Sequence, residues 1–198
     1  MRGTQAERLQ KTLKAFDEAN RRDPKQIIFQ GIAWPAELLY GRRMTACLKR
    51  YFPKASESLV LATRAQHICR WEIPRDAYPM NRKGYFTWRN KLKAFHAEKA
   101  GAIMTQMGYE SASIQRVQFL LAKKQLRKDT ETQTLEDVAC LVFLEYYFEA
   151  FSQKYNEEKL IDILQKTWRK MSKRGQEIAL SLSLPTQQAQ LVKLALSA

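Results

Sequence analysis

Apolar residues recur at intervals of three and four along almost the whole chain, which is the period of an α-helix. This spacing predicts helices over residues 4–19, 35–52, 56–71, 85–107, 111–126, 135–151, 157–171, 175–183 and 186–197. No segment shows a convincing alternation of apolar and polar residues, so we expect no strand. The predicted fold class is therefore all-α.

One run within this pattern indicates where a core lies. Residues 138–144 are apolar on every side of their predicted helix, which is typical of a helix at the centre of a domain. A chain of 198 residues is long enough for one domain with a single substantial core. We expect one all-α domain over residues 1–198, with an N-terminal helix and connector (1–24), a helical core (35–171) and C-terminal helices (172–198).

Net charge and cysteine content indicate the cellular compartment and the class of binding partner. The chain has 34 Lys and Arg against 20 Asp and Glu, for a net charge of +14. This excess favours a phosphorylated or polyanionic partner, although the positive residues are dispersed in pairs. The N-terminus lacks an apolar signal core, no apolar run is long enough to cross a membrane, and the three cysteines lack paired spacing. We therefore expect a cytoplasmic protein with no membrane contact.

The segment 64–75 combines the residue types that suit chemistry. If the helix over 56–71 is continuous, Arg64, His67 and Trp71 share one face, and Arg70 and Arg75 lie close by. An imidazole flanked by guanidinium groups suits a bound phosphate. The alternative is that the arginines pair with carboxylates of neighbouring helices and that His67 is a core residue.

The segment that follows, residues 72–84, is the longest irregular stretch and contains Tyr78 between two prolines, Pro74 and Pro79. An ordered loop rich in Arg, Tyr and Pro beside a histidine is a candidate binding loop. It is equally typical of a connector packed by its own aromatic side chains.

The second histidine and one carboxylate are further candidates. His96 falls on the apolar side of the predicted helix over 85–107, so we expect it to point inward. Asp137 begins the most apolar helix, where the helix dipole alone explains an acid in the first turn. It also falls on the side of the predicted helix that faces the interior, where a carboxylate requires a partner or a metal ion. His67, His96 and Asp137 together would suit a divalent metal ion, although no local spacing supports the set.

Four segments carry a family resemblance. Residues 67–75, 78–80, 95–100 and 133–144 read HICRWEIPR, YPM, FHAEKA and QTLEDVACLVFL, and they closely resemble one conserved family of unknown function. The order of helices is similar to that of the HD-domain phosphohydrolases, all-α metalloenzymes that hydrolyse phosphate esters, often of nucleotides. The resemblance implies an HD-like helical bundle.

The resemblance to the phosphohydrolases is partial. The HD pair would fall on His67-Ile68, so the histidine is kept and the aspartate is replaced. The first metal-binding histidine would fall near Tyr40, and Asp137 matches the late aspartate. His96 resembles an extra histidine of some branches. The resemblance thus implies either a remodelled metal site or a pocket that has lost its metal.

Two functions follow from these observations. In the first, a hydrolase acts on a phosphorylated, nucleotide-like small molecule. His67, His96 and Asp137 would hold a divalent ion or transfer protons. The phosphate would bind to Arg64, Arg70, Arg75 and Lys124, while Trp71 or Tyr78 would stack on a base.

The alternative is a module that binds RNA or another polyanion without catalysis. Arginine and aromatic residues interleave between Arg70 and Arg89, where Tyr85 and Trp88 would stack on bases. A helical scaffold for a protein partner is a third interpretation.

Overall fold

The computed structural model describes residues 4–197 and is 71% helical, which confirms the predicted all-α class. The chain folds into two compact units, which divide between Gln125 and Leu126. The sequence predicted a single domain, and that the two units together form it stays a prediction. Within residues 4–197, no helix combines the length and apolar character needed to cross a membrane.

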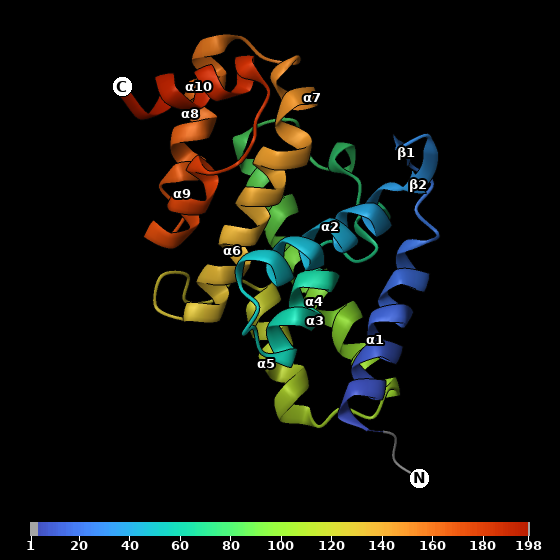
Figure 1. Ribbon diagram of the computed structural model, residues 1–198. Helices are drawn as coiled ribbons and strands as arrows, with labels where there is room; N and C mark the ends of the chain where they lie inside the picture. The colour runs from blue at the N-terminus through green and yellow to red at the C-terminus, as the bar shows by residue number, and fades with distance from the viewer. Residues whose placement is uncertain (1–3, 198) are drawn as a thin grey trace. The chain divides into compact units, whose positions relative to one another are not determined.

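The first unit is built from helices that bury apolar side chains between them. Figure 1 shows the course of these helices. The helices are α1 (Gln5–Asn20), α2 (Ala36–Tyr51), α3 (Glu57–Ala65), α4 (Arg82–Gln106) and α5 (Ser111–Leu121). Side chains cap three of these helices where they begin: Thr4 on α1, Ser56 on α3 and Asn81 on α4. Helix α5 packs on both α3 and α4, so the chain's middle helices form the body that carries the candidate site.

A short hairpin contradicts the prediction that the chain has no strand. Strands β1 (Gln26–Phe29) and β2 (Ile32–Pro35) pair antiparallel, with Ile27 opposite Trp34. Gln30 and Gly31 both have positive φ, 52° and 75°, as a two-residue hairpin turn requires. Strands of four residues are too short to show a clear alternation, and Gln-Gly is a weaker turn signal than Asn-Gly.

The predicted helix over 56–71 is also wrong at its end. Helix α3 ends at Ala65, and a turn leads to Cys69, whose φ is +52°. The 3₁₀ segments η1 (Arg70–Glu72) and η2 (Arg75–Ala77) follow. The side chain of Asn20 accepts a hydrogen bond from the Cys69 backbone N–H over 2.9 Å. Because the chain turns here, Arg64, His67 and Trp71 do not share a helix face.

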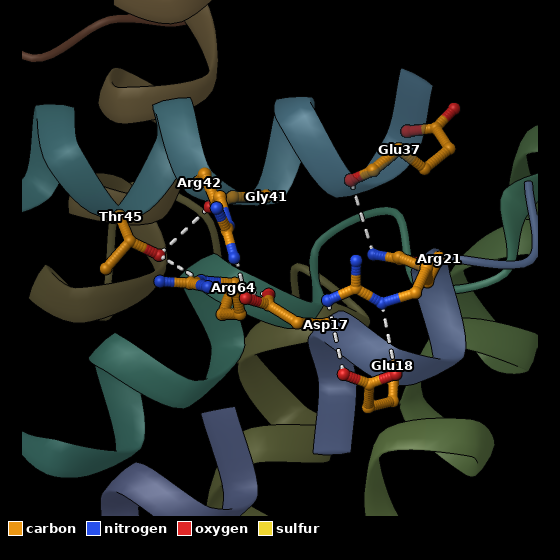
Figure 2. Close-up of polar contacts among 9 residues, drawn as sticks. Asp17, Glu18, Arg21, Glu37, Gly41, Arg42, Thr45 and Arg64 are labelled. Atoms are coloured by element: carbon orange, nitrogen blue, oxygen red, sulfur yellow. Dashed lines mark hydrogen bonds and ion pairs between the residues drawn. The ribbon is translucent and has the colours of Figure 1, made fainter. Parts of the chain in front are cut away.

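Ion pairs and hydrogen bonds link the first three helices (Figure 2). Asp17 of α1 accepts a hydrogen bond from Arg64 of α3 over 2.6 Å and one from Arg42 of α2 over 3.2 Å. Arg64 also donates to the hydroxyl of Thr45, which in turn donates to the carbonyl of Gly41. This network fixes α1, α2 and α3 against one another and so positions the turn that carries His67.

The second unit contains the most apolar stretch of the chain. Helix α6 (Thr130–Val142) continues through the π-helical segment η3 (Phe143–Tyr147) into α7 (Phe148–Ser152). Helices α8 (Glu157–Trp168), α9 (Lys173–Leu180) and α10 (Thr186–Ser197) complete the unit. Val138, Leu141 and Val142 are fully buried, which agrees with the prediction that residues 138–144 form part of a core.

Candidate anion-binding site

A pocket of about 230 Å³ lies in the first unit, between the turn after α3, helix α4 and the end of α5. It is lined by Gln66, His67, Arg70, Tyr85, Trp88, Arg89, Leu92, Lys93, His96, Leu121 and Lys123. A larger and more open depression of about 630 Å³ in the second unit is lined by surface residues such as Lys154, Tyr155 and Asp162. The smaller pocket is the better candidate because both histidines of the protein line it.

His67 is held on both of its ring nitrogens. Nδ1 lies 3.2 Å from Oε2 of Glu37, and Nε2 lies 3.2 Å from a guanidinium nitrogen of Arg70. The ring also stacks on Tyr40, with centroids 4.0 Å apart and planes 9° apart. A guanidinium can only donate, so Nε2 accepts, and the network assigns the proton of the neutral ring to Nδ1, which donates to Glu37.

His96 lies beside His67, with ring centroids 5.9 Å apart. It is only 4% exposed, and its Nδ1 lies 2.8 Å from the backbone carbonyl of Ile68. Burial, with a smaller contribution from His67, lowers the pKa of His96 to about 3. The prediction that His96 points inward is confirmed.

Positive charge surrounds the two histidines. The Arg70 guanidinium lies 4.8 Å from the centroid of the Trp88 ring, and Arg89 donates to the hydroxyl of Tyr85 over 3.1 Å. Burial, followed by the charges of Arg70, Lys123 and Arg89, lowers the pKa of His67 well below its usual value. Both rings are therefore neutral near pH 7.

Glu37 is a site residue that the sequence reasoning missed. Its carboxylate lies within 3.8 Å of Arg70 as well as contacting His67. Burial raises the pKa of Glu37 to about 7, against the opposing effect of Arg70. The only sequence signal is an acid in the first turn of α2, and that position is ordinary for a helix start.

Five residues predicted to bind phosphate or base do not line the pocket. Arg64 pairs with Asp17, and Arg75 donates to the carbonyls of Tyr78, Pro79 and Asn81, which holds the loop before α4. The others are Trp71, Tyr78 and Lys124. Arg70 is the predicted phosphate ligand that the structure places in the pocket with His67 and His96.

Asp137 belongs to the second unit, where it organises a helix start. Its carboxylate accepts hydrogen bonds from the backbone N–H of Ser172 over 2.8 Å, from the Ser172 hydroxyl, and from the side-chain amide of Gln133 over 3.0 Å. Ser172 in turn caps α9. These contacts satisfy the buried carboxylate within its own unit. Its convergence with the two histidines stays a prediction.

The donor atoms present do not suit a divalent metal ion. Both ring nitrogens of His67 are engaged, by Glu37 and Arg70, and Nδ1 of His96 is engaged by Ile68. Within residues 4–197, no group of three His, Cys, Asp or Glu side chains is arranged to hold a metal ion. The surrounding guanidinium and ammonium groups repel a cation and favour an anion. The predicted metal site therefore plays no part in the function proposed below.

Comparisons with known proteins place the chain in a family without assigning an activity. No curated protein and no solved structure matches it. The likeness to the HD-domain phosphohydrolases thus stays a prediction, while the resemblance to a family of unknown function is confirmed. A family model described as a domain of unknown function (DUF4202) matches residues 10–192, so the chain belongs to that family.

Proposed function

We propose that the pocket of the first unit binds a small phosphorylated ligand. The observation that carries the proposal is that Arg70, Arg89, Lys93 and Lys123 line one pocket together with two neutral histidines, of which His96 is buried. Within residues 4–197, Arg89 contacts Tyr85 but pairs with no carboxylate. Forked guanidinium donors are well suited to the oxygens of a phosphoryl group.

The size of the pocket bounds the ligand. Pockets for drug-sized molecules range from roughly 300 to 1,000 Å³, and this one is about 230 Å³. A phosphoryl group and the atoms next to it fill such a volume. Tyr85 lines the pocket and is 39% exposed, so the remainder of a larger ligand would contact it.

If the protein is a phosphohydrolase, His67 would accept a proton at Nε2 once Arg70 has moved from that nitrogen to the phosphoryl oxygens. Glu37 on Nδ1 orients the ring and leaves Nε2 as the basic nitrogen, which is the usual arrangement of a general base and its orienting carboxylate. Arg70, which contacts that nitrogen, would neutralise the charge of the phosphoryl oxygens. Release of inorganic phosphate from a phosphate monoester, lost in His67→Ala, would establish this activity.

The binding proposal is tested by titrating the protein with methyl phosphate at about 150 mM salt, where non-specific attraction is screened. We expect Arg89→Gln to weaken binding at least tenfold. Arg82→Gln is the matched control, because Arg82 is an exposed arginine of the same helix that lies over Phe86 and does not line the pocket. Equal affinities of the wild type and Arg89→Gln would contradict the proposal.

An RNA-binding function remains the second candidate because of the surface around the start of α4. Tyr85 and Phe86 are 39% and 51% exposed, and Arg75, Arg82 and Arg89 lie over their rings. Exposed aromatic rings beside arginines stack on unpaired bases. Binding of single-stranded RNA that persists near 150 mM salt and weakens in Phe86→Ala would support it. Loss of all binding at that salt concentration would leave only non-specific attraction.

A further inference from the structure

Two residues that line the pocket each carry a buried hydrogen-bond acceptor that has no partner within residues 4–197. They are Nε2 of His96 and Oε1 of Gln66, on side chains of residues that are 4% and 8% exposed. Both residues line the same pocket as the arginines and lysines described above. Buried polar atoms in folded proteins are nearly always paired, so two unpaired acceptors at one site indicate that a ligand supplies the missing donors.

The proton on His96 is placed by its neighbour. The carbonyl of Ile68 can only accept, so Nδ1 of His96 carries the hydrogen and donates it. Because the ring stays neutral, Nε2 then offers a lone pair and no hydrogen. This nitrogen cannot donate to a phosphate oxygen, and it requires an O–H or N–H group of the ligand.

A phosphate group alone does not satisfy this pocket. An ionised phosphoryl group offers only acceptors, which match the donors of Arg70 and Arg89 but leave His96 and Gln66 unpaired. A hydroxyl group does what the pocket requires, because it donates one hydrogen bond and accepts others. Sugar phosphates carry hydroxyl groups one or two carbons from the phosphate ester and so supply both kinds of group at the distance that one pocket spans.

We propose that the pocket selects a sugar phosphate, with the phosphoryl group on Arg70 and Arg89 and hydroxyl groups donating to Nε2 of His96 and Oε1 of Gln66. This inference rests on the proposed phosphate-binding function and extends it by naming the chemistry next to the phosphate. A buried site that hydrogen-bonds hydroxyl groups discriminates strongly against an analogue that lacks them, because its polar atoms are then left unpaired.

The test compares ribose 5-phosphate with methyl phosphate, a phosphate monoester without hydroxyl groups, by calorimetric titration. The wild type should bind ribose 5-phosphate at least tenfold more tightly. Gln66→Leu and His96→Phe, which remove one acceptor each, should reduce that ratio to about threefold or less. Gln115→Leu is the matched control, since Gln115 is exposed and lies outside the pocket.

The outcomes separate the two proposals. Equal binding of both compounds by the wild type overturns the sugar-phosphate inference and leaves phosphate binding intact. Binding of neither compound overturns both. A tenfold preference that persists in Gln66→Leu and His96→Phe also overturns the inference, because the hydroxyl groups are then recognised elsewhere. Circular dichroism shows which variants are folded, and the wild-type ratio and Gln66→Leu decide the matter if His96→Phe is not.

Discussion

The carboxylate of Glu37 lies 3.2 Å from Nδ1 of His67, although 30 residues separate the two in the sequence. The contact joins the first turn of α2 to the turn after α3. It fixes the tautomer of His67 and places one carboxyl group among the cations of the pocket. Glu37 and His67 therefore respond to pH as a coupled pair, and with His96 they make the stability of the first unit depend on pH.

The sign of this dependence follows from the pKa shifts. The pKa of Glu37 is raised to about 7, so the folded state holds a proton that the unfolded state releases, and this contribution to stability is lost as pH rises from about 4.5 to 7. The pKa values of His67 and His96 are lowered, so their contribution is lost as pH falls below 6.5. For each proton by which the folded and unfolded states differ, the free energy of unfolding changes by about 1.4 kcal/mol per pH unit.

We predict that Glu37→Gln makes the free energy of unfolding fall more steeply between pH 6.5 and 5 than it does in the wild type. The substitution removes Glu37, whose raised pKa opposes the effect of the histidines in this pH range. His96→Phe should have the reverse effect and flatten the curve. Urea unfolding at a series of pH values measures both slopes. Parallel curves for Glu37→Gln and the wild type would show that Glu37 does not titrate in the folded state near neutral pH.

The buried pairing of Asp17 gives a prediction about stability. Its side chain and that of Arg64 are 11% and 13% exposed, whereas those of Glu18 and Arg21 are 51% and 56% exposed. Figure 2 shows both pairs. Asp17→Ala leaves a buried guanidinium without its partner, so we expect the free energy of unfolding to fall by about 3 kcal/mol.

The neighbouring exposed pair is the control for this change. Glu18→Ala removes an exposed carboxylate of the same helix, and we expect a much smaller loss in the free energy of unfolding, because water screens an exposed ion pair. Urea unfolding curves of the two variants decide the matter. Similar losses for both would mean that the Asp17 network does not hold α1 against α2 and α3.

The sequence predicted the helices of the first unit well because their signals are local. The helix predicted over 85–107 is α4 (Arg82–Gln106), and Gly108 follows it with φ +76°, as a residue after a helix end often requires. The inward position of His96 follows from the same periodicity. The hairpin was missed because its strands have only four residues each. The turn at Cys69 was missed because its positive φ falls on a residue that is not glycine.

The site itself was only partly predictable. The arginines and histidines around position 67 were identified by residue type, but Tyr40 and Glu37 reach His67 from α2 through tertiary packing. Arg64 was assigned to phosphate because a continuous helix was assumed, and the turn after α3 removes that reason. No pattern in the sequence indicates that Gln66 and His96 carry unpaired acceptors, since pairing is decided by atoms far apart in the chain.

The donor set of the pocket leads to a prediction about metal ions. Zn²⁺, Mn²⁺ or Mg²⁺ at saturating concentration should shift the melting temperature by less than about 1 °C. Both ring nitrogens of His67 are engaged, and Nε2 of His96 is the histidine nitrogen that no group within residues 4–197 contacts. Ribose 5-phosphate under the same conditions should raise the melting temperature by several degrees. If a metal ion raises the melting temperature of the wild type but not of His67→Ala or His96→Phe, the result would support the predicted metal site.

Asp137 provides the last prediction, because its contacts give it a structural role that can be separated from ligand binding. It accepts hydrogen bonds from Ser172 and Gln133, and a methyl group added at Gly175 would lie 2.7 Å from its carboxyl carbon. Asp137→Ala leaves the backbone N–H of Ser172 unpaired at the start of α9, so we expect a loss of about 2 kcal/mol in the free energy of unfolding. Gly175→Ala should destabilise the same cap without removing the carboxylate.

Neither substitution should change the affinity for methyl phosphate measured well below the unfolding transition, since Asp137 does not line the pocket. Calorimetric titration of both variants tests this directly. The contrary result is an Asp137→Ala variant that remains folded but does not bind methyl phosphate, while Gly175→Ala binds it normally. That result would show that the carboxylate takes part in the site with His67 and His96. That result would favour the arrangement expected from the resemblance to the HD-domain phosphohydrolases over the pocket of the first unit acting alone.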